Sequence, residues 1–166
     1  PALTLGAWVA PFESVELQGT AEGLRPRARR DAQGRTHLAI YQNLNGRSSV
    51  FYSLDDGRRW SAPDDVADAP SRAWIQDLAV DAAGLPVTVW EEVRVATPND
   101  QIYLSRFDPA AFAWTQKERV STSPDGGANG RVAAARLPGG ADVVDVVWEE
   151  RPAGADTKVM HRRLAA

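Results

Sequence analysis

The fold of this chain is decided by a stretch that reads Ser53-Leu-Asp-Asp-Gly-Arg-Arg-Trp60. Gly57 supplies a backbone angle that other residues resist, and Asp55 is placed to accept backbone N–H groups of its own turn. The strand-forming residues 49–52 precede the turn, and residues 60–63 follow it. The stretch therefore predicts a tight turn between two antiparallel strands.

Two more strands are expected immediately before this pair. Residues 27–30 and 36–41 are predicted strands, and the turn Asp31-Ala-Gln-Gly34 between them is typical of a hairpin. The result is a unit of four short strands joined by turns. No stretch keeps a helical period over three turns, so few helices are expected.

The chain repeats this unit three times. Three apolar runs each follow a glycine-containing turn and end on an aromatic residue and a polar pair: residues 36–41, 86–90 and 142–148. Their final aromatic residues are predicted to be equivalent: Tyr41, Trp90 and Trp148. Matching places in the third strand are predicted for Tyr52, Tyr103 and Met160. The remaining strands are expected at residues 77–80, 101–104, 114–117, 131–136 and 158–161. Four short strands in a period of about 50 residues are typical of a β-propeller blade, which is a four-stranded antiparallel sheet.

The third repeat has no candidate for a fourth strand, and its counterpart is expected at the start of the chain. Trp8-Val-Ala-Pro11 matches Trp60-Ser-Ala-Pro63. We therefore expect one all-β domain, residues 1–166, built from three blades and a permuted outer strand. The blades are predicted at residues 25–68, 72–121 and 129–164, and the outer strand at residues 8–18.

Three blades do not readily close a ring, because propellers have about four blades or more. We expect two identical chains to form a six-bladed homodimer, in which each N-terminal strand completes the last blade of the other chain. The alternative is that the chain is an excised or engineered half of a longer propeller, without an activity of its own.

Composition excludes several classes of function. The net charge of −3, from 19 basic and 22 acidic residues, gives no electrostatic basis for binding nucleic acid. The absence of cysteine excludes a disulfide framework, a thiol nucleophile and a Cys-ligated zinc. No apolar run approaches the length of about 20 residues that a membrane helix needs, and no signal peptide is visible at the start of the sequence. His37 and His161 lack ligand spacing, so no metal or cofactor is expected.

The stretch at Ser53, Asp55, Gly57 and Trp60 resembles the Asp-box of the sialidase-like (BNR-repeat) β-propeller superfamily. The pattern Ser-x-Asp-x-Gly-x-Thr-Trp is matched at every position except the Thr, which is Arg59 here. The second repeat keeps an outline of the box at Ser105, Asp108 and Trp114. The resemblance implies that the box is structural, that it lies on the face away from the active site, and that export to the periplasm or the exterior is favoured.

Polar residues follow the second strand of each predicted blade and precede the first, so we expect them to gather at one mouth of the central channel. Carboxylates and amides bind hydroxyl groups, arginine recognises acidic groups bidentately, and tryptophan stacks on a sugar face. The sequence therefore predicts a non-catalytic binding or scaffolding module whose ligand is a carbohydrate. The ligand-binding candidates are Asn43, Arg47, Trp74, Asp77, Arg27, Arg94, Arg131 and Arg151.

A sialidase-like glycoside hydrolase is the alternative function. It would use two opposed carboxylates, taken from Glu91, Glu92, Glu149 and Glu150. The Arg-Ile-Pro motif of sialidases is absent, because the chain has Arg25-Pro-Arg27 instead. The resemblance also requires a tyrosine nucleophile, but Tyr41, Tyr52 and Tyr103 are all predicted to be core residues.

Overall fold

The computed structural model describes residues 23–44, 47–68, 72–94, 97–150 and 152–165. Within these ranges the chain forms twelve strands and no helix, which confirms the predicted all-β class. None of these residues belongs to a helix long and apolar enough to cross a membrane. The N-terminal strand expected at residues 8–18 lies outside the described residues.

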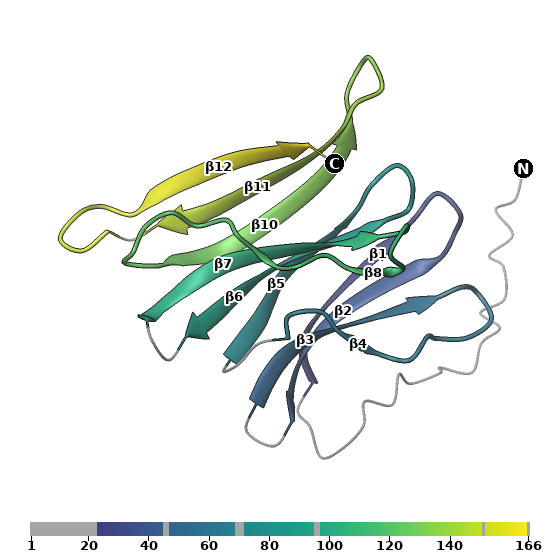
Figure 1. Ribbon diagram of the computed structural model, residues 1–166, viewed down its shortest axis with the longest axis horizontal. Coiled ribbons are helices and arrows are strands. Elements are labelled where there is room, and N and C mark those ends of the chain that lie inside the picture. The colour runs from purple at the N-terminus through teal and green to yellow at the C-terminus, as the bar shows by residue number, and fades with distance from the viewer. Residues whose placement is uncertain (1–22, 45–46, 69–71, 95–96, 151, 166) are drawn as a thin grey trace, which may run out of the picture.

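The strands follow one another as three antiparallel meanders (Figure 1). The first meander contains β1 (Gly23–Arg30), β2 (Thr36–Leu44), β3 (Arg47–Asp55) and the short β4 (Asp64–Asp65). The second contains β5 (Arg72–Val80), β6 (Pro86–Arg94) and β7 (Thr97–Asp108), with β8 (Ala113–Trp114) and β9 (Glu118–Arg119) both paired to β7. The third contains β10 (Gly127–Arg136), β11 (Asp142–Glu150) and β12 (Lys158–Ala165). Every longer strand covers a segment that the sequence predicted.

The fourth strands are shorter than expected and displaced. Trp60 makes only an isolated bridge to Asp55, and β4 begins four residues later. Of the predicted strand at residues 114–117, Trp114 lies in β8, whereas residues 115–117 lie between β8 and β9. A single parallel bridge between Ser48 and Arg72 joins the first two meanders into one sheet of nine strands, and the third meander is a separate sheet. Neither sheet closes on itself.

The three meanders pack face to face as layers, with the second meander in the middle (Figure 1). Successive residues of a strand point to opposite faces, so the second meander contributes to two cores. Trp90 and Tyr103 face the first meander, whereas Val89 and Ile102 face the third. Burial on both faces explains why β6 is an almost continuous apolar run.

The turns between the first and second strands of the first two meanders have the same hydrogen bonds. Gly34 N–H donates to the carbonyl of Asp31 at 3.1 Å, and Gly84 N–H donates to that of Asp81 at 3.0 Å. Both glycines have a positive φ, 82° and 81°, which L-residues with a side chain adopt only with strain. These turns fix a repeat of 50 residues between the first and second meanders.

The strand register corrects the predicted alignment of the first repeat by one residue. With a repeat of 50 residues, the equivalent of Trp90 is Ile40 and not Tyr41. Cross-strand pairing agrees, because Ile40 pairs with Phe51 as Trp90 pairs with Tyr103. The predicted match of Tyr52 with Tyr103 is wrong for the same reason. A shift of one residue moves a side chain to the other face of a strand, so Tyr41 cannot take the place of the tryptophans.

The third meander has one exposed face. Val147 and Val159 on this face are 39% and 79% exposed. Their equivalents in the second meander are Val89 and Ile102, and both are fully buried. The third meander therefore leaves open the face that the second meander buries.

Candidate functional site

Arg27, Asp77 and Arg131 occupy the same position in the first strands of the three meanders. Each follows a β-bulge and pairs with the residue directly before the tryptophan position of the neighbouring strand. β5 contacts both β1 and β10, so the three first strands are neighbours. The bulges also give two non-glycine residues, Arg25 and Asn129, nearly equal positive φ values of 57° and 56°.

The carboxylate of Asp77 joins all three first strands. It accepts hydrogen bonds from the guanidinium of Arg29 in β1 at 3.0 Å and from the backbone N–H of Val132 in β10 at 3.3 Å. The N–H of Leu78 in its own strand donates a third, at 2.9 Å. Asp77 is 7% exposed, so these donors compensate for its burial. Asp77 therefore has a structural role, because its hydrogen bonds connect the three layers.

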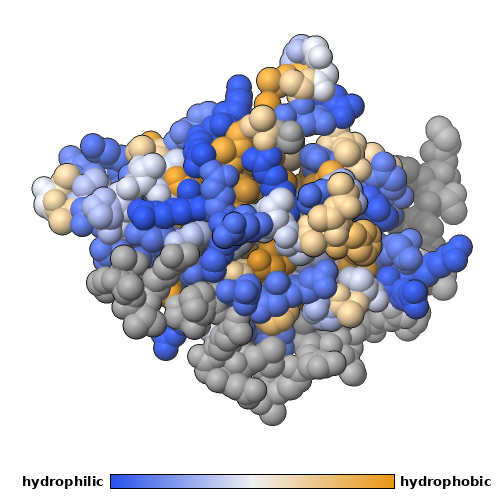
Figure 2. Space-filling view, viewed as in Figure 1, coloured by the Kyte–Doolittle hydropathy of each residue, from blue (hydrophilic) through white to orange (hydrophobic). Residues whose placement is uncertain are grey.

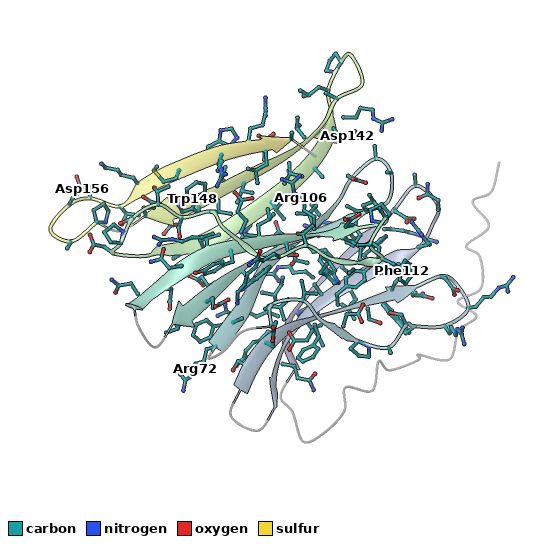
Figure 3. The ribbon with its side chains drawn as sticks, viewed as in Figure 1. Arg72, Arg106, Phe112, Asp142, Trp148 and Asp156 are labelled. Atoms are coloured by element: carbon teal, nitrogen blue, oxygen red, sulfur yellow. The ribbon has the colours of Figure 1, made fainter. Side chains whose placement is uncertain are left out.

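The other candidate side chains on the first strands are more exposed to solvent than Asp77. Arg131 is exposed and donates to the carbonyl of Gly130 at 2.8 Å, and Arg27 is half-buried and donates to that of Pro26 at 3.2 Å. Trp74 is half-buried and packs against the first core. Arg72 lies at this end of the molecule, opposite to Phe112 (Figure 3).

Glu92 is a buried member of an ion pair. Its carboxylate accepts from the indole N–H of Trp90, two residues earlier on the same face of β6, at 3.2 Å. Lys117 Nζ donates to both carboxylate oxygens, at 3.0 and 2.8 Å, and also to the carbonyl of Ala67 at 3.1 Å. The lysine also lies over the ring of Tyr103, 5.6 Å from its centroid. Glu92 thus connects β6 with the segment that leads into the second meander.

Glu150 is the equivalent buried carboxylate of the third meander, and it is held by N–H donors instead of a lysine. It accepts from the indole N–H of Trp148 at 3.0 Å and from the backbone N–H groups of Thr122 and Ser123 at 2.7 and 3.1 Å. Burial by itself raises the pKa of Glu150, but these donors outweigh it and hold the pKa below its usual value. Glu150 therefore stays ionised and anchors the segment that leads into β10.

The first glutamate of each pair has a different environment. Glu91 and Glu149 are half-buried and lie on the opposite faces of their strands from Trp90 and Trp148, and both make contacts within the fold. The two glutamates of a pair therefore point to different sides of a layer. The remaining candidates lie outside the part of the chain that the structure describes. They are the side chains of Asn43, Arg47 and Arg94, and the whole of Arg151.

The stretch at Ser53–Trp60 forms the expected turn. Asp55 Oδ1 accepts the N–H of Gly57 at 2.8 Å, and Gly57 has a φ of 87°. Ser53 Oγ donates to the carbonyl of Ser61 at 2.8 Å. Ser105 donates to the carbonyl of Thr115 in the same way, also at 2.8 Å, so the second meander keeps this contact.

The partners that hold these carboxylates could not be predicted from the sequence. Lys117 and Arg29 carried no motif, and their contacts with Glu92 and Asp77 span 25 and 48 residues of sequence. The spacing Trp-x-Glu did contain a signal, because a period of two places the indole and the carboxylate on one face of a strand. Among the described residues, no group of three or more histidine and acidic side chains is placed to hold a metal ion.

Comparisons with protein-family models and with curated proteins found no match to this chain.

Proposed function

We propose that this chain is a half-propeller of the sialidase-like kind, which acts as a non-catalytic binding or scaffolding module and completes a six-bladed ring as a homodimer. Three equivalent blades are supported by the bulges of all three first strands, by the matching turns of the first two meanders, and by the buried carboxylates of the last two. The observation that carries the pairing is the exposure of Val147 and Val159 at positions that are buried in the other blades.

The packing of the third meander on the second indicates which strand would pack on the third. Gly130 of β10 lies directly on Val89 and Ile102: a Cβ added there would be 3.2 and 3.3 Å from these side chains. β1 has the same bulge as β10 and the same positive φ at its centre. We expect β1 of a second copy to lie on Val147 and Val159 as β10 lies on the second meander.

The outer edge of the third blade supports the same partner. β3 and β7 each pair with a short outer strand, whereas β12 pairs only with β11 among the described residues. The predicted outer strand at residues 8–18 of the second copy would take this place. Each contact of this kind occurs twice in a dimer, so the two halves close a ring rather than a filament.

A binding role fits the site better than hydrolysis does. Glu92 and Glu150 are buried and hold strands together through the contacts described above, so they are poorly placed to act on a substrate. Arg131 and Arg72 are exposed at this end of the first strands, and Trp74 and Arg27 are half-buried. Guanidinium groups beside an indole recognise polar ligands, and a carbohydrate is the ligand class we propose here.

The test is the solution mass measured by light scattering at two protein concentrations. We expect twice the 18.0 kDa of one chain. Val159→Glu places a charge on the proposed interface and should give a monomer, whereas Phe112→Glu, at a residue that is exposed in a different layer, should leave the mass unchanged. A monomeric wild type would refute the pairing. Turnover of a fluorogenic sialoside that is lost in Glu91→Gln or Glu149→Gln would instead support the hydrolase.

A further inference from the structure

A pocket of about 600 Å³ lies between the first and second meanders. It is lined by the turns that connect the first and second strands and by the β7–β8 hairpin, so it lies at the opposite end of the layers from the polar mouth. No residue proposed for the mouth lines it. All of its walls come from one chain, and the following inference is independent of the proposed pairing and of the proposed mouth ligand.

The rings of Tyr52, Phe107 and Phe112 line the pocket, and the ring of Trp114 connects Phe107 with Tyr52. Phe112 contacts Phe107 edge to face at 5.5 Å between centroids, Phe107 contacts Trp114 at 6.0 Å, and Trp114 contacts Tyr52 at 5.1 Å. Figure 2 shows a pale apolar patch over the β7–β8 hairpin, where Figure 3 labels Phe112. The apolar lining is completed by Leu54 and Leu85.

Phe112 is an unusual residue for a soluble surface. It is 84% exposed, and its backbone φ is 50°, in the left-handed region that bulky side chains rarely adopt. Among the described residues, the ring contact that stabilises Phe112 is the one with Phe107, and most of its surface stays exposed. A ligand that covers the ring would gain from it, because apolar area would be removed from water.

A chain of buried hydrogen bonds forms the polar wall. Asp31 accepts from Arg35 Nε at 2.6 Å and lies 3.1 Å from His37 Nε2, and His37 Nδ1 lies 2.8 Å from the hydroxyl of Tyr52. Burial raises the pKa of Asp31, but the bonds from His37 and Arg35 outweigh it, so the pKa is far below its usual range. Burial lowers the pKa of His37, which keeps the ring neutral.

These charges determine which group donates and which accepts in each hydrogen bond of this series. An ionised Asp31 only accepts, so His37 carries its proton on Nε2 and accepts on Nδ1. Tyr52 must then donate its proton to His37, which leaves the phenolic oxygen as an acceptor. Asp64 lines the same pocket and contributes acceptor oxygens, whereas the charge of Arg35 is neutralised by Asp31.

We propose that this pocket binds an uncharged ring that carries a hydroxyl group, with the ring against Phe107 and Phe112 and the hydroxyl donated to Tyr52. An anion is disfavoured, because Tyr52 and Asp64 present acceptor oxygens and the guanidinium of Arg35 is already paired with Asp31. Neutral sugars and phenols share this chemistry, and both fit the volume.

The experiment follows backbone amide NMR shifts during titration with three probes: methyl glucoside, phenol and benzoate. We expect saturable shifts at Ala83–Leu85 and Phe112 with one of the two hydroxylated probes, and at least tenfold weaker binding of benzoate. Shifts with the glucoside alone identify a sugar site, and shifts with phenol alone identify a site for aromatic alcohols.

Phe112→Ala should weaken the bound probe at least fivefold without loss of folding, because the side chain is exposed. Val159→Ala, which truncates an exposed side chain in another layer, is the matched control and should bind as the wild type does. Tyr52→Phe should also weaken binding, through loss of the acceptor. The proposal is overturned if neither hydroxylated probe gives saturable shifts, if benzoate binds as tightly, or if Phe112→Ala leaves the affinity unchanged.

Discussion

The carboxylate of Asp77 in β5 accepts a hydrogen bond from the guanidinium of Arg29 in β1 at 3.0 Å. The same carboxylate receives the backbone N–H of Val132 in β10, so one side chain holds a strand from each layer. Other polar contacts also cross between layers, such as those of Arg35 with Gly84 and of Arg162 with Glu118, but Asp77 is bonded to both neighbouring layers at once. It sets how the three first strands are offset along their length.

Asp77→Ala should destabilise the fold by about 2 kcal/mol, because it leaves the buried N–H of Val132 without an acceptor. Arg29 is half exposed and can turn to water, so its share of the loss is small. Urea denaturation measures the effect. Asp156→Ala removes an exposed carboxylate in the third meander and is the control. Equal urea midpoints for the two variants would refute this structural role of Asp77.

Glu92→Ala should cost about 3 kcal/mol, because the ammonium of Lys117 is then left partly buried without its counter-ion. A double-mutant cycle with Lys117→Met isolates the pair, and we expect the two losses to be non-additive by more than about 0.5 kcal/mol. The exposed pair of Arg136 and Asp142 provides the comparison, since Asp142→Ala should have a much smaller effect. Additive losses at Glu92 and Lys117 would contradict a coupled pair.

Stability should fall as the pH drops below 6.5, the ordinary pKa of histidine. Burial lowers the pKa of His37 in the folded chain, so the unfolded chain binds a proton first and is favoured by acid. One group gives a slope of at most about 1.4 kcal/mol per pH unit. The lowered pKa values of Asp145 and Glu150 act at lower pH.

The midpoint of urea unfolding between pH 7.5 and 5.5 measures this slope. His37→Gln should flatten the profile, and His161→Gln, at the exposed histidine, serves as the comparison. If the profile of His37→Gln is as steep as that of the wild type, the buried hydrogen-bond chain does not control the acid sensitivity.

Gly84→Ala should destabilise the fold more than Gly34→Ala, although both glycines have the same φ and the same turn. At Gly34 the new methyl group meets only ordinary contacts, so the cost is the backbone strain of about 1 kcal/mol. At Gly84 it would lie 2.5 Å from Arg35 Nη2 and 3.2 Å from Asp31 Oδ2. Thermal denaturation of the two variants checks the order, and equal melting temperatures would be inconsistent with close packing at Gly84.

The strands and turns could be predicted because their signals are local. The alternation of residues, together with Asp31–Gly34 and Asp81–Gly84, is sufficient to place each hairpin. The register of the first repeat is harder to predict, because an aromatic residue does not always mark the equivalent position. Tyr41 is aromatic but lies one place beyond Ile40, which takes the tryptophan position. The spacing of 50 residues between the two turns carries this signal, and the cross-strand pairing agrees with it.

The contacts at the candidate sites could not be predicted because they connect different layers. Asp77 was a candidate from its place near the first strand, but Arg29 and Val132 are 48 and 55 residues away. The aromatic pocket was missed for the same reason. His37 and Phe112 carry no motif, and the chain brings them together only after two layers have packed.

The exposed face around Val147 and Val159 also has a consequence for motion. Each layer contacts only its neighbours, so stability is distributed along the stack and need not be equal in all layers. The third layer is held from one side among the described residues, and β12 forms its open edge. In a single chain we therefore expect local unfolding to begin at β12, with the fastest amide exchange in its outward-facing N–H groups and the slowest in β6.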